Sequence, residues 1–109
     1  MDVTINTRHC TVPESIRNQT QIRLQRVARF NPVVLRGAVN FNCEGSERQV
    51  DVRLHMKGTS PLLGHGTGGT FRTALDRAIE RVERQLKSRN QRYRNRRPPA
   101  HLQEAAITA

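Results

Sequence analysis

The most constraining feature of the sequence is the strict alternation of polar and apolar side chains over residues 49–57. Val50, Val52, Leu54 and Met56 are separated from one another by single polar or charged residues. Because successive side chains of a β-strand point to opposite faces, this pattern predicts a strand with one buried and one solvated face. Such strands are typical of an antiparallel sheet that is covered on one side.

Three other segments are candidates for the remaining strands. Residues 1–6 alternate in the same way, and residues 33–42 predict a second strand that Gly37 weakens. Residues 62–69 contain four glycines, and we expect them to form a poor edge strand that runs into a mobile turn. A phosphate-cradling loop is the alternative for this stretch, but the spacing is not GxGxxG and the Lys-Ser/Thr ending of a P-loop is missing.

Two amphipathic helices can cover the apolar face of this sheet. The first runs from Pro13 to a stop at Asn31-Pro32, and the second begins after Thr70, which can cap it. Their apolar positions are Ile16, Thr20, Leu24 and Val27 in the first helix, and Phe71, Leu75, Ala78, Ile79, Val82 and Leu86 in the second. The predicted fold is α+β, a β-α-β-β-β-α two-layer sandwich with two helices on one face of a four-stranded sheet. Residues 1–97 should form this single domain, and residues 98–109 a short flexible tail.

The charge of the chain favours a nucleic-acid partner. Lysine and arginine total 19 against nine acidic residues, which gives a formal net charge of +10, and only Lys57 and Lys87 are lysines. Arginine presents a planar fork that binds phosphate through two hydrogen bonds and stacks on bases, so this bias favours nucleic acid over a membrane surface. A solvated basic surface is the alternative, but the charges are patterned as well as abundant.

The pattern is clearest on the second helix. On the side of this helix opposite the apolar stripe, a sector about 80° wide contains Arg77, Arg81, Arg84 and Arg92. The acidic residues of the helix lie in a separate, neighbouring sector. Arginines of the first helix flank its own buried face, so the outer surfaces of two adjacent helices would form a continuous basic groove. The alternative is a solvated face whose basic residues pair in part, at i,i+4, with Glu80 and Glu83, as Arg84 could with Glu80. The predicted RNA-binding residues are Arg23, Arg26, Arg29, Arg77, Arg81, Arg84, Lys87, Arg89 and Arg92.

Other classes of function have little support in the sequence. No Ser-His-Asp, Cys-His or paired-carboxylate arrangement has the spacing of a catalytic site, although Asp51 and His55 share the wet face of one strand. Cys10 and Cys43 form no CxxC pair and are expected to be reduced structural thiols. We therefore expect no enzymatic activity, metal, cofactor or small-molecule substrate. No apolar run reaches the roughly 20 residues of a membrane span, and the N-terminus is unlike a signal peptide, so a cytoplasmic location without membrane contact is expected.

The mode of RNA recognition can also be narrowed. No pair of aromatic residues lies on a strand as in an RNA-recognition motif, and no GXXG loop joins two helices as in a KH domain. Base-specific reading is therefore not expected, and recognition should go mainly through phosphates and folded shape.

The second helix resembles a known family. The sequence Phe71-Arg72-Thr73-Ala74-Leu75-Asp76, then Ile79, then Arg81-Val82-Glu83-Arg84-Gln85-Leu86-Lys87, is similar to the "AID…I…KL.RQL.K" signature of ribosome hibernation-promoting factors, also called ribosome-associated inhibitors. The β-α-β-β-β-α order is that family's fold, and it is similar to double-stranded RNA-binding domains. The glycine-rich stretch before Phe71 departs from the family's usual strand.

The resemblance implies a role at the ribosome. Family members occupy the mRNA and tRNA channel of the small subunit, contact rRNA near the decoding centre, and silence and protect resting ribosomes. The positions of this chain that match the family's basic residues are Arg23, Arg26, Arg81, Arg84, Lys87 and Arg89. The chain looks like a short form, which either promotes ribosome dimers with a companion dimerisation factor or holds single ribosomes. Two alternatives stay open: a general double-stranded RNA-binding or RNA-chaperone module, and a protein-interaction adaptor whose basic face serves solubility.

Overall fold

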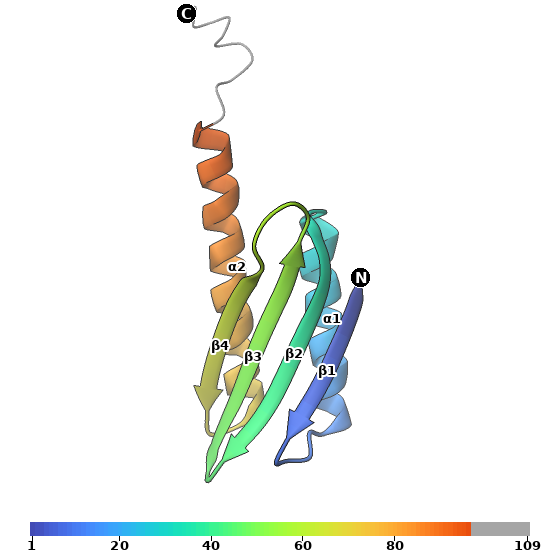
Figure 1. The fold of residues 1–109 in the computed structure, drawn as a ribbon. Coiled ribbons are helices and arrows are strands. Elements are labelled where there is room, and N and C mark those ends of the chain that lie inside the picture. Colours follow the sequence, from blue (N-terminus) through green and yellow to red (C-terminus); the bar gives the residue numbers. More distant parts are fainter. Residues whose placement is uncertain (97–109) are drawn as a thin grey trace, which may run out of the picture.

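The computed structural model describes the backbone of residues 1–96 and the side chains of residues 1–89. Its elements are β1 (Asp2–Arg8), α1 (Glu14–Phe30), β2 (Val34–Glu44), β3 (Glu47–Met56), β4 (Leu62–Gly68) and α2 (Phe71–Arg96) (Figure 1). The predicted β-α-β-β-β-α order is thus confirmed. The tail expected at residues 98–109 lies outside the described residues.

The four strands form one sheet in the order β1-β2-β3-β4. Strand β3 is antiparallel to both of its neighbours, as its alternation predicts. Strands β1 and β2 are parallel, so the sheet is mixed and not purely antiparallel. The reason is connectivity: α1 links β1 to β2, and a helical crossover returns the chain to the same end of the sheet. Both helices lie on one face of the sheet, α1 behind β1 and β2 and α2 behind β3 and β4 (Figure 1).

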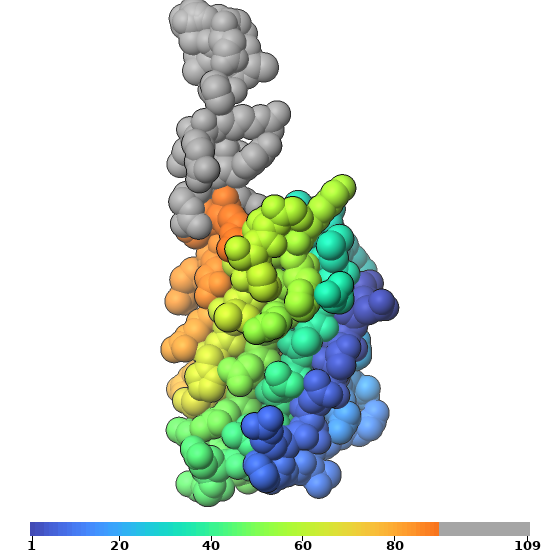
Figure 2. Space-filling model, viewed as in Figure 1, coloured from blue at the N-terminus to red at the C-terminus, as the bar shows by residue number. Residues whose placement is uncertain are grey.

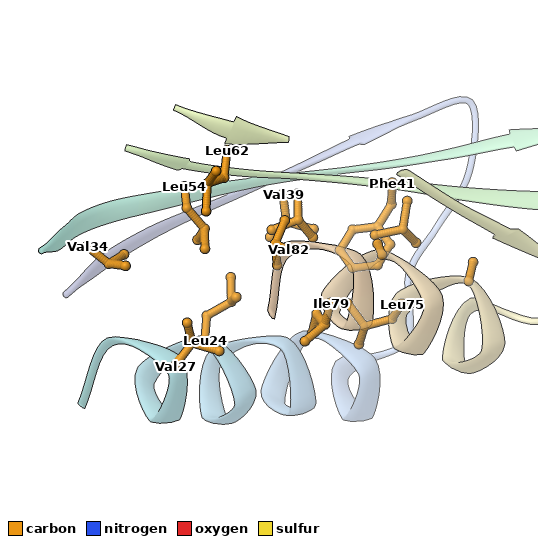
Figure 3. Close-up of a cluster of buried hydrophobic side chains, with 14 of the residues drawn as sticks. Leu24, Val27, Val34, Val39, Phe41, Leu54, Leu62, Leu75, Ile79 and Val82 are labelled. Atoms are coloured by element: carbon orange, nitrogen blue, oxygen red, sulfur yellow. The ribbon is translucent and has the colours of Figure 1, made fainter. Parts of the chain in front are cut away.

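The core lies between the sheet and the two helices. Figure 3 shows Val39 and Phe41 of β2 pointing toward Leu24 of α1 and toward Leu75 and Ile79 of α2. All six predicted apolar positions of α2 are buried, and in α1 Thr20, Leu24 and Val27 are buried while Ile16 is partly buried. The predicted core faces of both helices are therefore confirmed. Within the described residues, no helix is long and apolar enough to span a membrane.

The predicted start of α2 is also confirmed. The hydroxyl oxygen of Thr70 accepts a hydrogen bond from the backbone N–H of Thr73 at 3.2 Å, which satisfies one of the free donors at the helix N-terminus. At the end of α1, the side-chain amide of Asn31 donates to the carbonyl oxygen of Val27 at 2.8 Å. Asn31 therefore ends the helix by satisfying one of its last carbonyl groups.

The glycine-rich stretch corrects one expectation. Residues 62–68 form the expected edge strand, which pairs with β3 from Leu62 to Gly68, but its pairing is regular and not poor, and the turn begins only after Gly68. Gly64 and Gly66 are buried and face α2, as every second residue of a strand can. A Cβ added to Gly66 would lie 2.2 Å from the backbone oxygen of Ala74, and one added to Gly64 would lie 2.5 Å from that of Ala78. The glycines therefore let the backbone of α2 pack directly on β4.

This close approach predicts the effect of a single methyl group. The substitution Gly66→Ala should lower the free energy of unfolding by about 1–3 kcal/mol, because the new Cβ would collide with helix backbone that cannot rotate away. Urea denaturation measures the loss.

Gly69→Ala is the matched control. A Cβ at Gly69 meets nothing within 4 Å, so this variant should unfold at nearly the wild-type urea concentration. Equal unfolding midpoints for the two variants would show that α2 does not depend on a glycine face of β4.

Candidate nucleic-acid interface

Four of the predicted RNA-binding residues present free charges on the helical layer. Arg26 and Arg29 on α1, and Arg84 and Lys87 on α2, are exposed. Within the described part of the chain, their side chains make no hydrogen bond or ion pair, so the alternative pairing of Arg84 with Glu80 is absent. Each of them is therefore available to an external anion.

A second set of side chains on α2 bonds to the edge strand. Nη1 of Arg77 donates to the carbonyl oxygen of Thr67 at 2.7 Å, and Nη1 of Arg81 donates to that of His65 at 2.7 Å. One turn further along, the amide of Gln85 donates to the carbonyl oxygen of Leu63 at 2.8 Å. Four helical residues rise about 6 Å and two strand residues about 6.7 Å, so side chains four apart on α2 meet carbonyls two apart on β4.

The opposite edge of the sheet is covered in the same way. The side-chain amide of Gln25 donates to the carbonyl oxygen of Met1 at 2.7 Å, and that of Gln21 lies 3.5 Å from the carbonyl oxygen of Val3. Unpaired carbonyls on an edge strand can recruit another polypeptide strand. Both helices therefore shield a sheet edge with polar side chains, and Arg77 and Arg81 have this structural role besides any external contact.

Arg23 is partly neutralised within the molecule. Its guanidinium makes an ion pair with Asp76, which joins α1 to α2, and the side chain is only 27% exposed. A hollow further along the two helices is lined by Arg26 and Lys87 but also by Glu83. The expected groove between the helices is therefore not continuously basic, because Asp76 and Glu83 of α2 lie next to residues of α1.

The structure brings three predicted residues together at the other side of α2. Arg81, Arg84 and Arg89 line an open hollow of about 390 Å³ beside the loop between β3 and β4. Arg89 is held there by hydrogen bonds from Nη1 to the hydroxyl of Thr59 at 2.7 Å and to the carbonyl oxygen of Ser60 at 3.0 Å. The side chain of Arg92 lies outside the described residues.

The open face of the sheet is formed by the outward side chains of the four strands, among them the exposed Arg36 and Arg53. Figure 2 shows this face, on which the four strands lie side by side without a covering helix. On this face Oδ1 of Asp51 lies 2.5 Å from Nδ1 of His65 on the neighbouring strand. Within the described residues, no group of three or more side chains could hold a metal ion.

The two cysteines lie beside one another at one end of the sheet. Both are free thiols and partly buried against the core. Burial, and to a smaller extent a hydrogen bond with Cys43, raise the pKa of the Cys10 thiol. A raised pKa keeps this thiol protonated at neutral pH and lowers its reactivity.

Comparison with known proteins identifies the class of protein to which this architecture belongs. A family model described as Sigma 54 modulation protein / S30EA ribosomal protein matches residues 3–94. The chain therefore belongs to that family, and the resemblance to hibernation-promoting factors is confirmed.

Solved structures show the same fold. The protein is similar to a ribosomal subunit interface protein from Coxiella burnetii, with a TM-score of 0.76 and 15% sequence identity over 84% of this chain and 99% of that one. It is also similar to the N-terminal domain of Protein Y from Thermus thermophilus, with a TM-score of 0.72 and 21% identity over 81% of this chain and 98% of that one. No curated protein sequence matches the chain.

The edge contacts of α2 predict the effect of their removal. In the double variant Arg77→Ala, Arg81→Ala, the carbonyls of Thr67 and His65 lose their side-chain donors, so the edge of β4 becomes available to a second copy. Sedimentation velocity over a concentration series should show stronger self-association than in the wild type.

The control removes the same charge without touching the edge. The double variant Arg84→Ala, Lys87→Ala loses two positive charges but no hydrogen bond to β4, and it should sediment as the wild type does. Identical behaviour of the two double variants would contradict the shielding role.

Proposed function

We propose that this protein is a ribosome-binding translation inhibitor. It occupies the mRNA and tRNA channel of the small ribosomal subunit, contacts rRNA there, and stabilises inactive ribosomes in stress or stationary phase. Membership of the S30EA ribosomal protein family over residues 3–94 supports ribosome association. The observation that carries the RNA contact is that four of the predicted residues, Arg26, Arg29, Arg84 and Lys87, are exposed, unpaired cations on the helical layer.

The physical basis of binding is neutralisation of phosphate. Cations that replace the counterions of a nucleic acid release those ions, which favours association without any chemical step. The proposal therefore assigns the protein to the cytoplasm, where ribosomes are, and gives it a binding role without catalysis. Residues 1–97 act as one ribosome-binding domain in this account.

The predicted residues divide into groups with different proposed roles. The four unpaired cations make the main phosphate contacts. Arg77, Arg81 and Arg89 each use one nitrogen on a strand or loop oxygen and keep further N–H donors for phosphate, because a guanidinium carries five. Arg23 contributes less charge because it pairs with Asp76, and Arg92 is assigned by helical spacing alone.

A sucrose-gradient profile of stationary-phase lysate tests the proposal against its alternatives. Co-sedimentation with ribosomes supports it, and the position of the peak separates dimers formed with a companion factor from single inactive ribosomes. Distribution of the protein over all RNA-containing fractions would favour a general RNA-binding or RNA-chaperone module. Protein that stays at the top of the gradient would favour a protein-interaction adaptor.

Charge reversal on α2 should abolish inhibition. The double variant Arg84→Glu, Lys87→Glu adds repulsion to rRNA but removes no core packing, because both side chains are exposed. Translation in a cell-free system should no longer be inhibited, while the melting temperature falls only slightly.

Val82→Ala is the complementary control. Val82 is buried, so this variant should lose stability and keep its basic surface and its inhibition at temperatures where it is folded. Full inhibition by the double charge reversal would show that this face of α2 does not bind the ribosome.

A further inference from the structure

Phe30 is an exposed aromatic residue at the end of α1. Its side chain is 71% exposed, whereas Phe41 is 0% and Phe71 is 9% exposed. Val33 and Leu35 are also exposed, so three of the five exposed large hydrophobic residues in the described part of the chain lie within residues 30–35. Of these three residues, Phe30 lines a hollow between the two helices, and an exposed aromatic ring beside cations is a suitable contact for a planar ligand.

The surroundings of Phe30 combine apolar and charged groups. Its ring lines a hollow of about 360 Å³ between the end of α1 and the middle of α2. The hollow is also lined by the apolar side chains Val27 and Leu86, by the cations Arg26 and Lys87, and by Glu83. Arg26 and Lys87 make no ion pair within the described residues, so both cations remain available to an external anion, although Glu83 lies in the same hollow.

The chemistry of this hollow matches an unpaired nucleotide. A nucleobase is planar and stacks face to face on an aromatic ring, and its phosphates need cations nearby. The carboxylate of Glu83 can accept a hydrogen bond from an exocyclic amine of a base. An apolar side chain of a partner protein would use the ring but would leave both cations of the hollow without a partner.

We propose that Phe30 stacks on an unpaired base of RNA while Arg26 and Lys87 bind the adjoining phosphates. This inference rests on the proposed RNA-binding function and extends it. Stacking on an aromatic ring distinguishes an unpaired base from a paired one, whereas contacts to phosphate alone do not. Any single-stranded RNA with an exposed base is a ligand of this kind.

The test compares a short single-stranded RNA with the same strand carrying an abasic site, so that the phosphates stay and the base is lost. Wild-type protein should bind the complete strand about tenfold more tightly. Phe30→Ala and Phe30→Leu should remove this difference, and Phe30→Trp should keep it. The chain has no tryptophan, so in the last variant quenching of tryptophan fluorescence reports stacking directly.

Ile22→Ala is the matched control, because Ile22 is 51% exposed on the same helix and lies outside the hollow. It should bind both strands as the wild type does. Equal binding of the two strands by the wild-type protein, or an unchanged preference in Phe30→Ala, overturns the stacking proposal. Ribosome co-sedimentation of the same variants separates the stacking proposal from the proposed ribosome-binding function. If Phe30→Ala no longer binds ribosomes but the wild type shows no preference for the complete strand, the ring contacts a protein and the stacking proposal is overturned. If the wild-type protein itself does not co-sediment, the proposed function is contradicted instead.

Discussion

The direct packing of α2 on β4 is the constraint on which the rest of the structure depends. Gly64 and Gly66 have no side chain to hold the helix away, and the facing helix positions are the small residues Ala74 and Ala78. The helix axis is therefore close enough to the sheet edge for side chains on its flank to reach the strand carbonyls. A larger residue on either surface would move the helix outward and break those hydrogen bonds.

This packing also divides the basic residues of the protein into two groups. Those on the flank of α2 that overlies β4, such as Arg77 and Arg81, are fixed by hydrogen bonds to the edge strand. Those further from the strand, such as Arg84 and Lys87, are free. An arginine whose guanidinium is already held loses less conformational freedom when it binds phosphate, so both groups are useful to an RNA-binding surface. Shielding the edge also keeps the sheet from recruiting a second strand.

The periodic parts of the fold could be predicted from the sequence, and the contacts between elements could not. The alternation around Val52 and the apolar stripe through Ile79 predicted a strand and a helix with the correct buried faces. The edge strand at the glycine stretch was predicted, but it was expected to be poor because glycine in a strand indicates flexibility unless its partner is known. The two-residue spacing of Gly64 and Gly66 was a usable signal of close contact with a helix. The ion pair of Arg23 links residues 53 positions apart, which no local pattern reveals. The exposure of the Phe30 ring at the end of α1 likewise depends on where α2 lies.

The central claim is that the helical face of this protein, and not its open sheet face, lies against rRNA. Photo-crosslinking from one position on each face tests it most directly, with a benzophenone amino acid replacing Glu80 on α2 or Leu63 on β4, both of which are exposed. Neither substitution removes a positive charge. The account predicts crosslinks from the position of Glu80 to rRNA of the small subunit, and far fewer from that of Leu63. Crosslinks to rRNA mainly from the position of Leu63 would contradict it.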